Sequence, residues 1–181
     1  SMSDGFLVVS NLDGALLDNI LDYLNYVVVP ALFLVEANLL PASFAMAGAI
    51  SILLTSPYQF TQVDAKTDAG SNEYFFKGFP DYWNVMVIYM LVLGLNPWLN
   101  FGFLVLFNIL IFVPIKYIYP TRTTRLKKLT LALTYLFGAL GLVGLVLYPN
   151  EPKWIWWVTL LYGVYYLALS LWPRKHEMTA A

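Results

Sequence analysis

The sequence contains no cysteine and only one histidine among its 181 residues. Without cysteine the chain can form neither disulfide bonds nor thiolate metal sites. The single histidine, His176, lies in a polar C-terminal tail, so we expect neither a histidine-rich metal centre nor a Ser-His-Asp triad. Any metal chemistry must therefore depend on oxygen ligands.

Charged residues are also scarce, at 12% of the chain, whereas 60% of the residues are hydrophobic. This composition is far too apolar for a soluble domain of this length. The formal net charge is −1, and the chain has no basic domain of the kind that binds nucleic acid. The composition therefore predicts a protein that lies among membrane lipids and has no nucleic-acid partner.

Six apolar stretches make up most of the chain. A helix needs about 20 apolar residues to cross a bilayer, and continuous apolar runs are not the alternating pattern of a transmembrane strand. We therefore predict an all-α, polytopic transmembrane bundle without strands, forming one membrane domain over residues 1–181. The expected spans are about 20–40, 42–60, 82–95, 98–119, 129–148 and 154–172.

The basic residues predict how this bundle is oriented. With a cytoplasmic N-terminus and six spans, every lysine and arginine except Lys153 falls on the cytoplasmic side, as the positive-inside rule requires. This distribution is typical of a multi-pass protein of the bacterial inner membrane. Pro30 and Pro114 fall inside expected spans, and we expect each of them to kink its helix.

The first apolar stretch begins with two carboxylates on one helical face. Gly14, Asp18 and Asp22 recur at every fourth position, and residues four apart share a face of a helix. Neighbouring carboxylates repel each other unless a cation lies between them, and Mg²⁺ or Mn²⁺ prefers oxygen ligands. Glycine on the same face lets a ligand approach the backbone. The spacing therefore suggests a divalent-metal site.

Helix capping is the alternative explanation for one of these acidic residues. A carboxylate at a helix N-terminus caps free N–H groups and suits the helix dipole, so Asp13 or Asp18 could serve as the cap. Capping explains Asp22 poorly, because it lies a full turn further along. Two carboxylates are also too few for a metal site built from protein alone. Spacing by itself leaves both interpretations open.

The motif Gly14-x-x-x-Asp18-x-x-x-Asp22 resembles the second half of the signature of the CDP-alcohol phosphotransferase family, G-x-x-x-D-x-x-x-D. The chain is similar to the bacterial branch of that family that forms phosphatidylcholine, from about residue 8 onward. This similarity rests on residues 17–23, 66–68, 73–80, 83–84, 112–115, 120 and 122. The first half of the signature, D-x-x-D-G-x-x-A-R, is not present in residues 1–181. The resemblance therefore implies that about two N-terminal helices and half of the metal site are lacking here, and that these residues are inactive alone.

The resemblance also implies a reaction and roles. Choline would attack the lipid-linked phosphorus of CDP-diacylglycerol and release CMP, so these two molecules are the implied substrates. Asp18 and Asp22 are the implied ligands of Mn²⁺ or Mg²⁺, with Asp22 also the base that takes the choline proton. Gly14 would make room for the nucleotide. The active site would lie on the cytoplasmic side, and the resemblance is compatible with a homodimer.

Basic and aromatic residues on the expected cytoplasmic side are further candidates. Lys77, Arg122 and Arg125 could bind phosphate, since guanidinium groups make paired hydrogen bonds to it; membrane orientation is the alternative explanation for such residues. In the aromatic segment 73–83, the candidates for choline recognition by cation–π attraction are Tyr74, Tyr82 and Trp83. Anchoring in the membrane interface is the alternative explanation for them.

Two other functions remain open at this point. The chain could be a CDP-alcohol phosphotransferase that uses a different acceptor alcohol. It could also be a polytopic membrane protein without catalytic activity, such as a small transporter.

Overall fold

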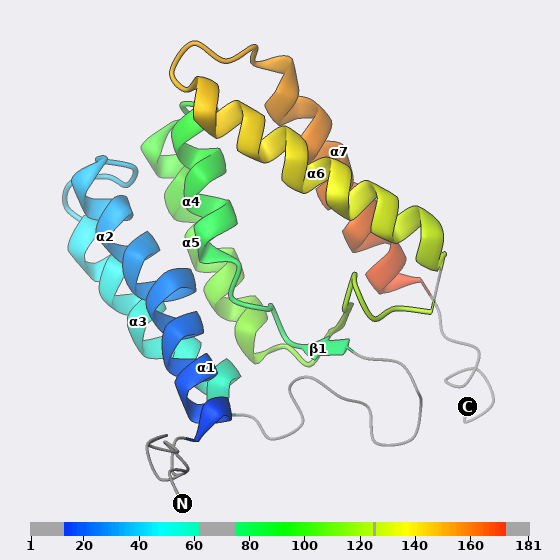
Figure 1. Cartoon of the computed structure of the whole chain (residues 1–181). Helices are drawn as coiled ribbons and strands as arrows, with labels where there is room; N and C mark the ends of the chain where they lie inside the picture. The colour runs from blue at the N-terminus through cyan, green and yellow to red at the C-terminus, as the bar shows by residue number, and fades with distance from the viewer. Residues whose placement is uncertain (1–12, 62–74, 125, 173–181) are drawn as a thin grey trace, which may run out of the picture.

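The structure is a computed structural model, and it describes residues 13–61, 75–124 and 126–172. Nearly all of the regular structure is helical, with one short antiparallel sheet (Figure 1). The prediction of a helical fold is thus confirmed. In chain order the elements are α1 (Gly14–Tyr23), the π-helix η1 (Leu24–Val28), α2 (Val29–Glu36), α3 (Ala45–Thr61), β1 (Phe75–Lys77), α4 (Trp83–Val92), α5 (Pro97–Phe112), β2 (Lys116–Ile118), α6 (Lys127–Leu147) and α7 (Trp154–Leu171).

Three helical runs are long and apolar enough to cross a membrane: Gly14–Glu36, Lys127–Leu147 and Trp154–Leu171. Helices α4 and α5 are apolar but shorter. Large apolar side chains lie exposed along these helices, as expected where lipid rather than water is the neighbour. The protein is therefore a membrane protein, and the number of six spans stays a prediction.

The first helical run is continuous through α1, η1 and α2. The π-helical turn comes directly before Pro30, which lies in the first turn of α2, where its missing N–H is best tolerated. Asn25 donates from Nδ2 to the carbonyl oxygen of Leu21 at 2.8 Å. The helical run therefore continues through Pro30, with a wider π-helical turn before it.

The predicted helix over 98–119 is wrong at its C-terminal end. Helix α5 stops at Phe112, and Val113 is extended, because a residue before proline avoids the helical conformation. Pro114 therefore ends the helix instead of kinking it. The chain continues into β2, a three-residue strand that the apolar runs did not predict. Strand β2 pairs antiparallel with β1, in the register Phe75↔Ile118, Phe76↔Tyr117 and Lys77↔Lys116.

The core lies between α2, α3, α4 and α5. Its most deeply buried apolar side chains include Leu34, Ile52, Trp83, Leu104 and Ile111. Gly78, just after β1, fixes the sheet against this core, because a Cβ there would come 2.5 Å from the Ile111 carbonyl oxygen and the residue has a φ of +82°. The sheet is therefore anchored at the end of α5.

Helices α6 and α7 form a hairpin beside this core (Figure 1). Hydroxyl groups join the two helices, with Thr130 2.8 Å from the Tyr165 hydroxyl and Thr134 2.8 Å from that of Tyr162. The hairpin is tied to the sheet because the Ile118 N–H donates to Ser170 Oγ at 3.1 Å. The sheet thus connects the core to the hairpin.

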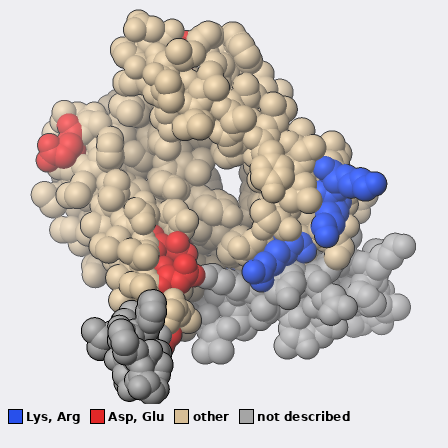
Figure 2. Space-filling view, viewed as in Figure 1, with Lys and Arg blue, Asp and Glu red and all other residues tan. Residues whose placement is uncertain are grey.

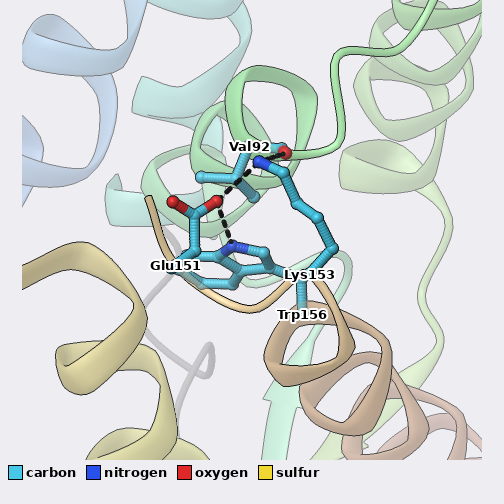
Figure 3. A network of polar contacts seen from close by, with 4 residues as sticks. All are labelled: Val92, Glu151, Lys153 and Trp156. Atoms are coloured by element: carbon cyan, nitrogen blue, oxygen red, sulfur yellow. Dashed lines mark hydrogen bonds and ion pairs between the residues drawn. The ribbon is translucent and has the colours of Figure 1, made fainter. Parts of the chain in front are cut away.

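A second connection lies at the opposite end of the molecule, in the turn between α6 and α7 (Figures 1 and 3). Glu151 accepts hydrogen bonds from Lys153 Nζ at 2.6 Å and from Trp156 Nε1 at 3.1 Å. Lys153 Nζ also donates to the Val92 carbonyl oxygen, at the end of α4, at 3.2 Å. This network holds the hairpin turn against α4.

Candidate active site

Asp13, not Asp18, caps the first helix. Its Oδ1 accepts hydrogen bonds from the N–H groups of Ala15 at 3.0 Å and Leu16 at 3.1 Å. Asp18 and Asp22 therefore lie within α1, one turn apart on the same face. Asp18 is exposed and Asp22 is half-buried. Capping no longer explains either carboxylate.

Gly14 is the first residue of α1 and lies in open space. A Cβ placed there would meet no atom within 4 Å, so the fold does not require glycine at this position. Among the described residues, none covers Gly14, and its nucleotide-binding role stays a prediction.

The two carboxylates fit part of a metal site. They offer the oxygen donors that Mg²⁺ and Mn²⁺ prefer, on an accessible helical face. Within the residues that the structure describes, no group of three or more His, Cys, Asp or Glu side chains could hold a metal ion. The remaining ligands must come from substrate oxygens or from groups outside the described residues.

Tyr26 extends this acidic face by one further turn. It lies four residues after Asp22, and its side chain is exposed. A tyrosine hydroxyl therefore continues the carboxylate-bearing face of α1.

Basic side chains gather across from the acidic face. Figure 2 shows acidic side chains over α1 and basic ones over the sheet and the start of α6, with an opening through the molecule nearby. Lys77 and Lys116 are direct partners across the two strands, and the Arg122 guanidinium lies over the Tyr119 ring at 5.4 Å. Ammonium and guanidinium groups are the side chains that bind phosphate oxygens in proteins. The arrangement thus suits phosphate.

Lys116 was missed by the sequence reasoning, which read it only as part of the membrane-orientation signal. Its position opposite the predicted phosphate ligand Lys77 depends on the pairing of two strands that lie about forty residues apart in the chain. No local pattern marks that pairing. Among the other candidates, Arg125 and Tyr74 lie outside the described residues.

The two described candidates for choline recognition lie in different surroundings. Trp83 is 1% exposed and donates from Nε1 to Ser56 Oγ at 2.9 Å and to Asp81 Oδ1 at 3.2 Å, so its indole is engaged in the core. Tyr82 is half-buried, and its ring contacts Phe76 and Tyr166. Of the two, the structure favours Tyr82 as a ligand contact.

Several curated proteins are similar to this chain. It is 43% identical to the phosphatidylcholine synthase of Legionella pneumophila, over 96% of this chain and 69% of that protein. The chain belongs to the phosphatidylcholine synthase family. The enzyme of that name from Legionella bozemanae is 38% identical over 90% of this chain and 76% of that protein. For Borreliella burgdorferi the identity is 34%, over 91% of this chain and 69% of the relative. No family model and no solved structure matches the chain.

Membership of the phosphatidylcholine synthase family confirms the resemblance to enzymes that form phosphatidylcholine. It identifies the protein as a lipid-forming transferase and disfavours the interpretation as a transporter. Membership of the CDP-alcohol phosphotransferase family stays a prediction. The roles of Gly14, Asp18, Asp22, Lys77 and Arg122 stay predictions.

Proposed function

We propose that the protein transfers the phosphatidyl group of CDP-diacylglycerol to choline, with release of CMP. The observation that carries this proposal is the pair Asp18 and Asp22, in a member of the phosphatidylcholine synthase family. Both carboxylates lie on one accessible helical face, and the helix is already capped by Asp13. Neither carboxylate caps the helix, and neither forms an ion pair within the described residues.

In this mechanism Asp22 acts as the general base. Its half-buried carboxylate accepts the proton of the choline hydroxyl as that oxygen forms a bond to the lipid-linked phosphorus. The bond from this phosphorus to the oxygen of CMP breaks, and the electron pair leaves with CMP. A Mn²⁺ or Mg²⁺ ion held by Asp18 and Asp22 would supply charge neutralisation of the diphosphate.

The basic residues opposite α1 hold the phosphates in this proposal. Lys77 and Lys116 lie opposite each other on adjacent strands, and Arg122 follows β2 with its guanidinium over Tyr119. Arg125 lies outside the described residues and stays a candidate. Arginine can bind phosphate through two parallel hydrogen bonds. Gly14 leaves space for the nucleotide beside the carboxylates.

The location of the site follows from the charge distribution. We place it at the cytoplasmic side of a bacterial inner membrane, where the positive-inside rule puts the basic segments between the helices. A homodimer stays a prediction.

The test uses membranes that contain the protein expressed from its complete gene. With CDP-diacylglycerol, labelled choline and Mn²⁺, labelled phosphatidylcholine should form, and chelation of the metal should stop it. Glycerol phosphate, serine and inositol phosphate serve as competing acceptors. A lipid product from one of these and none from choline would assign a different acceptor, and no lipid product from any acceptor would overturn the proposed activity.

A further inference from the structure

Four aromatic rings from four separate segments meet beside the sheet. They are Phe76 in β1, Tyr82 at the start of α4, Tyr119 after β2 and Tyr166 in α7. We call this group the aromatic box. All four residues are half-buried, so part of each side chain remains accessible.

The rings of the box enclose a corner. Phe76 and Tyr82 have centroids 6.2 Å apart with planes at 77°, and Tyr82 and Tyr166 have centroids 6.4 Å apart with planes at 62°. Tyr119 stacks on Phe76 at 4.8 Å. The walls of the corner are thus steeply inclined to each other, as in a cage that surrounds a rounded group.

The box lies near the helical run that carries the carboxylates. Helix α4, which begins directly after Tyr82, packs against η1, the continuation of α1. On the same face of the molecule, Figure 2 shows acidic side chains over α1 and basic ones over the sheet. The box and the proposed base therefore belong to neighbouring elements.

The chemistry of the box suits a cation that cannot donate hydrogen bonds. Aromatic faces attract such cations through the ring quadrupole, at centroid distances of about 6 Å. One ring of the box already has a cation over it, since the Arg122 guanidinium lies over Tyr119 at 5.4 Å. Within the described residues, the buried Tyr166 hydroxyl has no hydrogen-bond partner.

We propose that the aromatic box binds the quaternary ammonium group of the acceptor alcohol while Asp22 takes the proton from its hydroxyl. This inference rests on the proposed function, because it needs choline as the acceptor. In choline only two methylene groups separate the ammonium from the hydroxyl. The groups that bind these two ends must therefore lie close together, so the proposal predicts that one choline molecule reaches both the box and Asp22.

Tyr82 and Tyr166 are the residues to test, because their inclined rings form the corner. Tyr82→Leu and Tyr166→Leu remove a ring and should each raise the KM for choline about 10-fold, with the KM for CDP-diacylglycerol within about 2-fold of the wild type. Tyr135→Leu is the matched control: this tyrosine is 71% exposed on α6 and should leave both KM values unchanged. Folded leucine variants with the wild-type KM for choline would overturn the proposal.

A second series avoids any loss of folding. Phenylalanine with increasing numbers of ring fluorines is incorporated at position 82 or 166, which weakens the quadrupole and leaves the ring shape nearly unchanged. The logarithm of the KM for choline should rise with each fluorine, whereas the KM for CDP-diacylglycerol should not. A flat series at both positions would overturn the proposal.

Failure of this inference is distinguishable from failure of the proposed function. If the wild type forms phosphatidylcholine and the box variants bind choline normally, the transferase activity stands and the box has only a packing role. If the wild type uses an acceptor without a quaternary ammonium, both proposals fail.

Discussion

The structure uses its carboxylates in two contrasting ways. Asp81, before α4, and Glu151, between α6 and α7, are buried, and each accepts a hydrogen bond from a tryptophan indole N–H. Asp18 and Asp22 lie on an accessible face of α1, which contains no buried residue. The first pair of carboxylates is part of the fold, and the second pair is not.

The buried carboxylates also differ from each other. Burial raises the pKa of the Asp81 carboxyl to about 7, although hydrogen bonds from Ser56 and Trp83 oppose the rise. The hydrogen bond from Lys153 lowers the pKa of Glu151. Glu151 thus has a cation that compensates its burial, whereas Asp81 accepts from a hydroxyl and an indole N–H. Asp18 is exposed and makes no hydrogen bond or ion pair within the described residues, so its carboxylate is accessible to a ligand.

The largest effect on activity is expected from substitution of Asp18 or Asp22. Asp22→Asn should lower kcat about 1,000-fold, because an amide cannot accept the choline proton, and Asp18→Asn should abolish the response to added Mn²⁺. Neither substitution should change the Tm, since α1 buries none of its residues. The measurements are phosphatidylcholine formation and thermal unfolding of the purified full-length protein.

Glu36→Gln is the control for this pair. Glu36 is an exposed carboxylate at the other end of the same helical run. It should leave both activity and Tm at wild-type values. If Glu36→Gln reduced activity as much as Asp22→Asn does, the special role of the α1 face would be refuted.

The next effect concerns the pH dependence of stability. The pKa of Asp81 is about 7 in the folded protein, whereas the ordinary value, expected in the unfolded chain, is 3.8. Between these two pH values the folded protein therefore holds a proton that the unfolded chain has lost. Stability should therefore fall as pH rises from about 4 to about 7, by an amount on the order of a few kcal/mol. Asp81→Asn should abolish this slope and make the protein more stable than the wild type at pH 8.

The measurement is the unfolding midpoint in detergent between pH 4 and pH 8. Ser56→Ala, which removes one hydrogen bond to the same carboxylate, should raise the pKa further and keep the slope. An Asp81→Asn variant with an unchanged slope would mean that another group causes the pH dependence.

Local patterns were sufficient to predict the acidic helix and most helix positions. The spacing of Asp18 and Asp22 and the long apolar runs are properties of short segments, so the sequence contains them directly. The end of α5 could also have been predicted, because Pro114 disfavours a helical conformation at Val113. The uninterrupted apolar character of 98–119 outweighed that signal in the prediction.

The sheet and the aromatic box could not be predicted in this way. Strands β1 and β2 have three residues each, too few for an alternating pattern, and their pairing joins distant segments. The sequence around Tyr166 predicts only an apolar helix. Its ring contacts with Tyr82 and Tyr117 become known only from the packing of α7. The two carboxylates of α1 can be found from local spacing. The basic and aromatic side chains of the sheet and the box come together only when the chain folds.

The smallest expected effect comes from the other buried carboxylate and is a loss of stability alone. Glu151→Ala leaves Trp156 Nε1 without its acceptor and removes the ion pair with Lys153, so we expect a Tm about 5 °C below the wild type. Because this network lies at the opposite end of the molecule from α1 (Figures 1 and 3), kcat and both KM values measured at low temperature should not change. Trp156→Phe, which removes only the indole donor, should lower the Tm by less. A Glu151→Ala protein with normal Tm and reduced kcat would reverse the assignment, because it would make Glu151 part of the site.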